Sequence, residues 1–241
     1  MVKYLRGLIY MQKYQYLLFD VDQTLLDFKA CERSALQESF AYFNLNQRHD
    51  IYDYYQQYNK QLWQDFENGK IQRETIFEIR FNNVFKHFKI DLDGKVFEAY
   101  YRSRLSANHQ LMPYALEVLQ HLSEKYDIYL VSNGLIQTQR QRIKESQIQQ
   151  YVKGIFISEE IGFKKPSKEY FDYVFCHIPC FQKDKALMIG DSLNADMLGG
   201  RQVGLDVCFM NEANIKQNIV KVDYEINDLR QLIAILEGNH E

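Results

Sequence analysis

Two aspartates, Asp20 and Asp22, directly follow the hydrophobic run Tyr16-Leu17-Leu18-Phe19. The run predicts a buried β-strand, and the carboxyl ends of such strands are where open α/β sheets bind their ligands. Two carboxylates this close raise each other's pKa unless a cation or a proton separates them. The pair is therefore a candidate for metal binding or acid–base chemistry, provided that the chain supplies complementary charge elsewhere.

Further polar side chains follow three other predicted strands. They are Ser132 and Asn133, then Lys164 and Lys165, and finally Asp191 and Asp196. The last two lie five residues apart across a strand-to-helix turn, a spacing that can bring both carboxylates to one ion. Four carboxylates contribute −4 and Lys165 contributes +1, since Lys164 is expected to be a solvated neighbour. The remaining negative charge is unfavourable, because a carboxylate pair repels by about 4 kcal/mol at 4 Å and an effective dielectric of 20. A divalent cation is therefore expected, and all-oxygen ligands favour Mg²⁺.

Two other metal sites are less well supported. An EF-hand also starts with Asp-x-Asp, but its glycine position is Leu25 here and its closing glutamate position is Cys31. Cys176 and Cys180 are spaced differently from the paired C-x₂-C turns of zinc sites. Buried free thiols are the interpretation that we favour for the four cysteines of the chain.

The elements that must position these groups alternate between strand and helix after Pro113, which is expected to start a helix. Strands are expected over residues 127–131, 154–158, 186–189 and, as the last one, 207–210, with a helix opened by Ser167 and a closing helix over 228–237. Alternating strands and helices favour a parallel, doubly wound sheet.

The segment between the first strand and Pro113 has a different pattern. Apolar residues such as Ile76, Ile79 and Val84 recur at helical intervals, Gly69 is expected to end one helix, and residues 91–94 form a loop. We therefore predict an α/β fold in which a doubly wound, parallel-sheet, Rossmann-like core of residues 12–27 and 108–241 carries a helical domain, residues 28–107, inserted after the first strand.

Composition excludes several functional classes. A net charge of −3 gives no basic footprint for a nucleic acid polymer, and no apolar stretch approaches the roughly 20 residues of a membrane span. Residues 1–10 lack the apolar region of a signal peptide, and the natural start could be Met11. With no paired cysteine framework, a cytoplasmic protein is expected. We expect it to be a monomer or a homodimer.

The four strand-end motifs, in this order, resemble those of the haloacid dehalogenase superfamily of phosphohydrolases over essentially the whole chain. They are Asp20-Val21-Asp22-Gln23-Thr24, Ser132, Lys165-Pro166, and Gly190-Asp191 followed by Asp196. Any one of these motifs is weakly specific, whereas four in register are strongly so. The resemblance implies that the helical insert is a cap domain that selects the leaving group.

The resemblance also assigns roles to the residues. Asp20 would be the nucleophile that forms an aspartyl-phosphate, and Asp22 the general acid and base. Lys165 would neutralise negative charge on the nucleophile and the phosphoryl group. Phosphate oxygens would be held by Ser132, by the backbone near Asn133 and by Thr24, while Mg²⁺ would be bound by Asp20, the carbonyl of Asp22, Asp191 and, directly or through water, Asp196. Thr24 as a turn cap and Asp196 as a helix N-cap are the structural alternatives.

The helical insert and three segments of the core point to one group within the superfamily. The segment from Asn59 to Ile71 is similar to the cap signature of bacterial pyrimidine 5′-nucleotidases, as are residues 157–162, 165–173 and 197–200. This similarity implies hydrolysis of a small phosphate ester, UMP, dUMP or dTMP, with Trp63 and Phe66 as candidate contacts to the base. Packing in the core of the insert is the alternative role for Trp63. Gln23 departs from the glutamate that is frequent at this position in the nucleotidases.

Two other functions share the motifs. A sugar-phosphate phosphatase or phosphoglucomutase would have the same core and the same type of cap. A non-catalytic, phosphate-binding regulator would be expected to have lost a motif residue, and none is missing here.

Overall fold

The computed structural model describes residues 12–45, 48–67, 69–216 and 219–238. Residues 1–10, for which no signal peptide is expected, lie outside the described residues. The chain divides into two compact units: unit 2 comprises Lys29–His109, and unit 1 the described residues up to Phe28 and from Gln110 onward. These limits lie one and two residues beyond those expected from the sequence.

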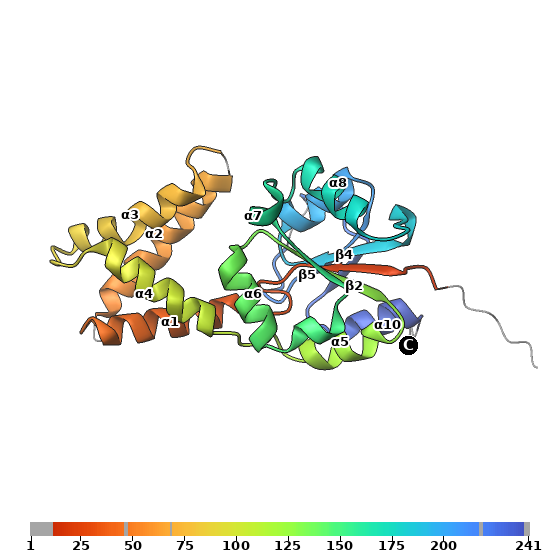
Figure 1. Cartoon of the computed structure of the whole chain (residues 1–241), viewed down its shortest axis with the longest axis horizontal. Helices are drawn as coiled ribbons and strands as arrows, with labels where there is room; N and C mark the ends of the chain where they lie inside the picture. The colour runs from red at the N-terminus through yellow and green to blue at the C-terminus, as the bar shows by residue number, and fades with distance from the viewer. Residues whose placement is uncertain (1–11, 46–47, 68, 217–218, 239–241) are drawn as a thin grey trace, which may run out of the picture. The chain divides into compact units, whose positions relative to one another are not determined.

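Unit 1 is built on a parallel sheet of six strands in the order β3-β2-β1-β4-β5-β6 (Figure 1). The strands are β1 (Tyr16–Phe19), β2 (Asp127–Ser132), β3 (Gly154–Ile157), β4 (Ala186–Gly190), β5 (Asp206–Met210) and β6 (Tyr224–Ile226). The predicted doubly wound α/β fold is confirmed. The expectation that the strand near residues 207–210 is the last was wrong: β6 follows it, and its three residues are too few to show an alternating pattern.

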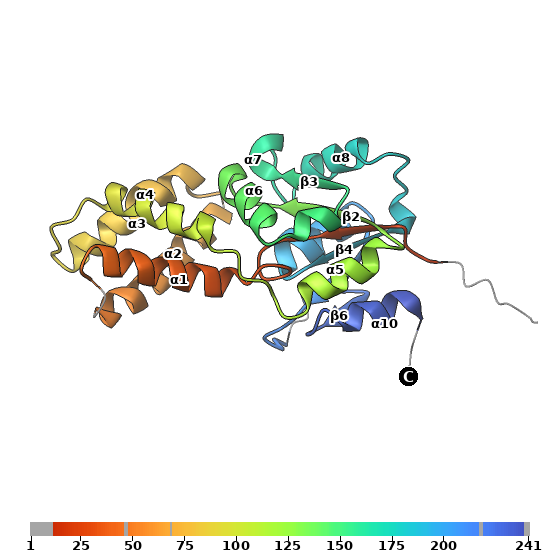
Figure 2. The same ribbon diagram turned by 60° about the horizontal axis from the view of Figure 1, so that its bottom comes forward.

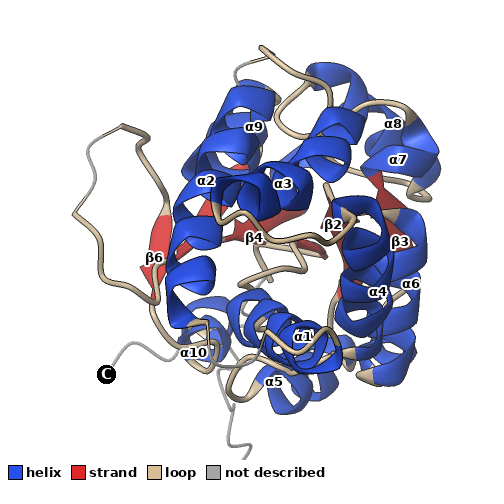
Figure 3. Cartoon of the chain, turned by 90° about the vertical axis from the view of Figure 1, so that its left-hand side faces the viewer, coloured by secondary structure: helices blue, strands red, loops and turns tan. Residues whose placement is uncertain are grey.

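Helices cover both faces of this sheet, as Figures 2 and 3 show. They are α5 (Ala115–Ser123), α6 (Ile136–Glu145), α7 (Ser158–Ile161), α8 (Lys168–His177), α9 (Gly199–Gln202) and α10 (Gln231–Glu237), with the short turns η1 (Ile148–Tyr151), η2 (Lys183–Lys185) and η3 (Leu193–Leu198). Ser167 caps α8 through its side chain, as expected. The strand expected over 154–158 ends one residue early, because Ser158 begins α7, and the closing helix starts three residues later than expected.

The central strand β1 is buried on both faces because its side chains alternate between two cores. Leu17 and Phe19 lie in one apolar core with residues of α5, α6 and α10. Tyr16 and Leu18 lie in the other core with residues of α8 and η3. This double burial explains the unbroken hydrophobic run at residues 16–19.

The register of the central strands brings the sequence motifs to one edge of the sheet. Phe19 of β1 pairs with Leu130 of β2 and with Ile189 of β4. The residues that follow these three positions are therefore neighbours at the carboxyl edge, where parallel α/β sheets place their sites.

Unit 2 is a bundle of four helices whose core is rich in aromatic rings. The helices are α1 (Phe28–Tyr42, with Phe28 itself in unit 1), α2 (His49–Glu67), α3 (Arg73–His87) and α4 (Gly94–Ala107). Phe81 stacks on Tyr55 at 4.9 Å between ring centroids and contacts Phe97 at 4.5 Å. Gly69 lies just beyond α2, as expected, whereas Gly94 is the first residue of α4 and not part of a loop.

The described helices and cysteines bear on two expectations about the environment of the chain. No helix in the described part combines the length and apolar character that a membrane crossing requires. Cys31 and Cys208 are buried free thiols, whereas Cys176 and Cys180 are exposed, which corrects the expectation that all four are buried.

A buried ion pair lies inside the aromatic core of unit 2. Arg80 donates to both carboxylate oxygens of Glu98, at 2.6 and 2.7 Å, and its Nη1 donates to Tyr55 and Asn59 at 3.4 and 3.3 Å. A second buried carboxylate, Glu32, accepts bonds from Tyr55 and Asn59. The positive charge of Arg80 therefore lies in a network that contains two buried carboxylates, those of Glu98 and Glu32.

We expect Arg80→Met to lower the free energy of unfolding by about 3–5 kcal/mol, because it leaves Glu98 buried without its cation. Urea titration followed by the fluorescence of Trp63, the single tryptophan and a residue of unit 2, measures this loss. Arg48→Met, which removes an arginine from an exposed pair with Asp50, is the matched control and should change little. If Arg80→Met and Arg48→Met had equal effects, or if adding Glu98→Leu restored no stability, the pairing would not carry the predicted energy.

Candidate active site

The segment after β1 folds into a tight turn that fixes both aspartates. The backbone N–H groups of Leu25 and Leu26 both donate to the carbonyl oxygen of Val21 at 2.9 Å, and the N–H of Gln23 donates to the carbonyl of Leu26 at 2.7 Å. Asp20 remains beside β4, where its N–H donates to the carbonyl oxygen of Ile189 at 2.8 Å. The turn therefore separates Asp20, at the strand end, from Asp22, which it carries.

Lys165 connects three elements of the site through one ammonium group. Its Nζ donates to Asp20 Oδ1 at 2.6 Å, to Asp196 Oδ1 at 2.7 Å and to the carbonyl oxygen of Val131 at 2.8 Å. These bonds use all three hydrogens of the ammonium, and Lys165 is 2% exposed. The lysine therefore has one fixed position between two buried carboxylates.

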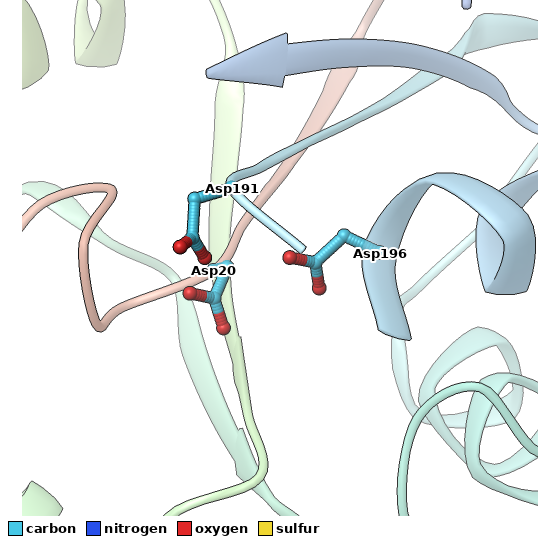
Figure 4. Close-up of side chains that lie close together, drawn as sticks. All are labelled: Asp20, Asp191 and Asp196. Carbon is cyan, nitrogen blue, oxygen red and sulfur yellow. The ribbon is translucent and has the colours of Figure 1, made fainter. Parts of the chain in front are cut away.

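Three carboxylates, those of Asp20, Asp191 and Asp196, form a cluster at this edge of the sheet (Figure 4). One oxygen from each lies within 4.8 Å of the others. Asp196 has both oxygens engaged, because Oδ1 accepts from Lys165 and Oδ2 accepts from the N–H of Ser192 at 3.0 Å. In contrast, the hydrogen bond that Asp20 accepts from the described side chains is the one from Lys165 to Oδ1, and none reaches Oδ2.

The approach of Asp196 requires a glycine at the end of β4. A Cβ atom on Gly190 would lie 2.3 Å from Asp196 Oδ2 and 2.5 Å from its Cγ, so a side chain there would displace the carboxylate. Ser192 caps the following turn, since its Oγ accepts from the N–H of Ala195 at 3.1 Å. Ser192 is therefore the N-cap residue of η3, and Asp196 does not have that role.

The burial of this cluster alters its proton affinities. Burial raises the pKa of Asp20 well above its usual value; Lys165 opposes the rise, and the carboxylates of Asp196 and Asp191 add to it. For Lys165, burial lowers the pKa, but the carboxylates of Asp196 and Asp20 outweigh that effect and the net pKa is raised. The lysine therefore stays protonated, while the acidic cluster is short of positive charge.

The donor set fits a hard divalent cation. Among the described residues the cluster offers carboxylate oxygens, without thiol or imidazole ligands, and such a set suits Mg²⁺. Asp20 and Asp191 could be direct ligands, whereas the two existing bonds of Asp196 favour binding through a water. The side chain of Asp22 lies outside this cluster, in keeping with an expected role for its backbone carbonyl alone.

The three predicted phosphate contacts differ in their surroundings. Ser132 is buried at the end of β2, and its Oγ accepts from the N–H of Gly134 at 3.0 Å. The Asn133 side chain pairs with the backbone of Lys165, with both bonds at 2.9 Å, and so positions the lysine segment. Thr24 Oγ1 is buried with no hydrogen-bond partner among the described residues, so the threonine hydroxyl caps no turn.

Two residues of α6 that the sequence analysis did not identify contact Asp22. Arg142 Nη1 donates to Asp22 Oδ1 at 2.6 Å, and Gln139 Nε2 donates to Asp22 Oδ2 at 2.5 Å. The sequence of α6 is mostly polar, and its two apolar residues, Ile136 and Ile143, are too few for periodicity to indicate the buried face. The available signal was their spacing of three residues directly after the motif at Ser132, which places them on one face of a helix.

The predicted cap contacts lie in the other unit. Trp63 and Phe66 pack edge to face at 5.8 Å between ring centroids, and Trp63 also contacts Phe77 at 6.3 Å. Both side chains are partly exposed. Trp63 therefore contributes to packing within unit 2 and keeps part of its surface available.

We expect Asp191→Asn to stabilise the protein in EDTA by about 1–3 kcal/mol, because it removes one of three mutually repelling carboxylates. Thermal and urea unfolding with EDTA measure this gain. Asp184→Asn removes one exposed carboxylate on η2, outside the cluster, and controls for net charge. A variant that is no more stable than this control would show that the cluster carries no repulsion in the absence of metal.

Comparison with known proteins agrees with this arrangement. A family model described as haloacid dehalogenase-like hydrolase matches residues 17–210. YfnB of Bacillus subtilis is 42% identical over 94% of this chain and 97% of its own length. A crystal structure of YfnB bound to magnesium matches with a TM-score of 0.88 over 93% of this chain and 99% of that chain.

Two further relatives are named as pyrimidine 5′-nucleotidases. PynA of Streptococcus pneumoniae is 34% identical over 94% of this chain and 96% of its own length. YjjG of Escherichia coli is 29% identical over 93% of this chain and 98% of its own length. The predicted family is confirmed: the chain belongs to the haloacid dehalogenase-like hydrolases.

Proposed function

We propose that this hydrolase is a Mg²⁺-dependent phosphomonoesterase that acts on the pyrimidine nucleoside 5′-monophosphates UMP, dUMP and dTMP. The observation that carries the proposal is the state of Asp20. Lys165 holds one of its carboxylate oxygens, and the other accepts no bond from the described residues, within a cluster suited to a cation. Such a carboxylate is a positioned nucleophile.

In the first half of the reaction, the free oxygen of Asp20 attacks phosphorus. A bond forms between Asp20 Oδ2 and phosphorus while the bond from phosphorus to the nucleoside 5′ oxygen breaks. Asp22 donates a proton to that departing oxygen, which leaves as the nucleoside hydroxyl. The product on the enzyme is an aspartyl-phosphate.

In the second half, water replaces the aspartate on phosphorus. Asp22, now ionised, takes a proton from the water as its oxygen bonds to phosphorus, and the bond to Asp20 breaks. Inorganic phosphate leaves, and both aspartates return to their starting states. The two halves together consume one water and one phosphate ester.

The charge that develops on the phosphoryl oxygens meets donors that are already in place. Lys165 is fixed by three hydrogen bonds, so it needs no rearrangement to neutralise Asp20 and the phosphoryl group. The hydroxyl of Ser132 and the backbone near Asn133, at the end of β2, would bind phosphate oxygens. Asp20, Asp191, the carbonyl of Asp22 and, directly or through water, Asp196 would hold Mg²⁺, which would supply further positive charge to the phosphoryl group.

The choice of substrate rests on the relatives and on unit 2. PynA and YjjG, both named as pyrimidine 5′-nucleotidases, match along more than nine-tenths of the chain. We assign residues 12–27 and 108–241 to the catalytic core, residues 28–107 to the cap, and the reaction to the cytoplasm. Trp63 and Phe66 would then stack against the base, an interaction worth about 1–3 kcal/mol that tolerates different bases.

The substrate assignment predicts a preference that a phosphate-release screen can measure. With Mg²⁺ present, kcat/KM for UMP, dUMP and dTMP should exceed that for purine nucleotides and hexose phosphates. A hexose phosphate as the preferred substrate would instead support the sugar-phosphate phosphatase. Trp63→Ala should raise KM for UMP by about tenfold, while its effect on p-nitrophenyl phosphate stays small.

The role of Asp20 predicts a loss of chemistry without a loss of fold. Asp20→Asn should abolish phosphate release, because an amide cannot form the acyl-phosphate, and EDTA should abolish it in the wild type until Mg²⁺ is restored. Asp184→Asn again serves as the control for the change in charge. Unchanged phosphate release by Asp20→Asn in Mg²⁺ would refute the nucleophile assignment and leave the regulator as the better interpretation.

A further inference from the structure

The general acid and base of the proposed reaction is gripped by two side chains from one helix. Arg142 and Gln139, three residues apart on α6, each bind one carboxylate oxygen of Asp22. We propose that Gln139 and Arg142 are positioning residues, which hold Asp22 for proton transfer and direct the hydroxyl of Ser132 toward phosphate. This inference rests on the proposed function, because it concerns how the same site works.

Arg142 is the fixed point of this arrangement. Its side chain is completely buried, although it carries a full charge, and Asp22 is its ion-pair partner at 2.6 Å. The guanidinium also lies over the ring of Phe28, 5.5 Å from the ring centroid. A buried arginine is costly unless its charge is compensated, so loss of the contact with Asp22 would leave Arg142 with an uncompensated buried charge.

Arg142 also determines which way the amide of Gln139 faces. A guanidinium only donates hydrogen bonds, so the amide oxygen of Gln139 must face Arg142 Nη1, at 3.2 Å. The amide nitrogen is then directed to the other side, where it donates to Asp22 Oδ2 and, at 2.8 Å, to Ser132 Oγ. The arginine and the glutamine therefore act as one unit.

The hydrogen bonds from Arg142 and Gln139, together called the clamp, leave Asp22 able to transfer a proton. A carboxylate has about four lone-pair sites, and the bonds from Arg142 and Gln139 occupy one on each oxygen. A second site on each oxygen can carry a proton, and the side chain of Asp22 remains 31% exposed. The clamp therefore restricts rotation of the carboxylate without blocking its chemistry.

The same unit sets the direction of the Ser132 hydroxyl. Its oxygen accepts two hydrogen bonds, from Gly134 N–H and from Gln139 Nε2, and these use both lone pairs. The hydroxyl hydrogen is then the group that Ser132 can still offer, so it acts as a donor. A donor at this position suits a phosphoryl oxygen and would not suit a cation.

The side chain of Gln139 packs directly against the backbone of Gly134, two residues after Ser132. A Cβ atom on Gly134 would lie 2.5 Å from Gln139 Cγ and 2.6 Å from its Nε2. Gly134→Ala therefore disturbs Gln139 without changing any side chain that binds Asp22. It provides a second way to loosen the clamp.

The test compares two leaving groups through kcat/KM, which reports on the steps up to the first irreversible bond cleavage. Departure of the nucleoside from UMP needs a proton, whereas p-nitrophenolate leaves p-nitrophenyl phosphate without one. Arg142→Met should lower kcat/KM for UMP by about 100-fold and for p-nitrophenyl phosphate by less than about threefold. Arg140→Met and Gln141→Met, on the exposed face of α6, are the matched controls and should leave both values unchanged.

Gln139 contacts both functional residues, so its variant has a different expected signature. Gln139→Met and Gly134→Ala should lower kcat/KM for UMP more than for p-nitrophenyl phosphate, and should also raise KM for both substrates by loosening Ser132. Equal losses of kcat/KM on both substrates with unchanged KM would show a general structural role and overturn the proposal. Thermal unfolding of each variant confirms that the measured protein is folded.

A double-mutant cycle separates this inference from the proposed function. If Arg142 acts through Asp22, Arg142→Met should add no further loss on UMP in an Asp22→Ala background, whereas additive losses would refute the clamp. Should the wild type prefer another alkyl phosphate, the same cycle is run with that substrate. If phosphate release depends on Asp20 but the losses from Arg142→Met and Asp22→Ala are additive, the proposed function stands and only the positioning role of Arg142 is refuted.

Discussion

The rest of this site depends on the burial of one lysine between two carboxylates. Lys165 can occupy that position because its three ammonium hydrogens reach three different segments: Asp20 directly after β1, Val131 of β2 and Asp196 of η3. A compact ammonium with three divergent donors suits such a junction better than a planar guanidinium would. Gly190, which admits Asp196, and Asn133, which holds the lysine backbone, are consequences of the same requirement.

One lysine is nevertheless too little positive charge for the cluster. Its Nζ donates to Asp20 and Asp196, whereas the carboxylates of Asp20, Asp191 and Asp196 each place an oxygen within 4.8 Å of the others. A protein selected only for stability would neutralise one of these groups. The arrangement is reasonable if a cation and a phosphate ester complete it, so the local instability and the proposed activity have the same cause.

The sequence predicted the sheet and the strand-end groups because both follow from simple rules. Long apolar runs mark buried strands, and parallel strands bring their carboxyl ends together, so Asp20, Lys165 and Asp191 could be placed near one another without coordinates. The face that a polar helix buries has no such rule. Arg140 pairs with Glu160 at the surface, while Arg142, two residues later, is completely buried, and nothing in their types distinguishes them. Strand β6 was missed for a related reason, since three residues carry no periodicity.

The two aspartates of the first motif are chemically alike and become different through their neighbours. Asp20 is held by a lysine at one oxygen, and no described residue donates a hydrogen bond to the other, which suits a group that must form a bond to phosphorus. Asp22 is held at both oxygens by donors that cannot accept a proton from it, so it retains a fixed orientation while its remaining lone pairs stay available. A free oxygen favours nucleophilic attack, and a fixed carboxyl group favours proton transfer in one direction. Asp20 is hydrogen-bonded to Lys165 and Asp22 to Arg142. This difference supports the assignment of nucleophilic attack to Asp20 and of proton transfer to Asp22.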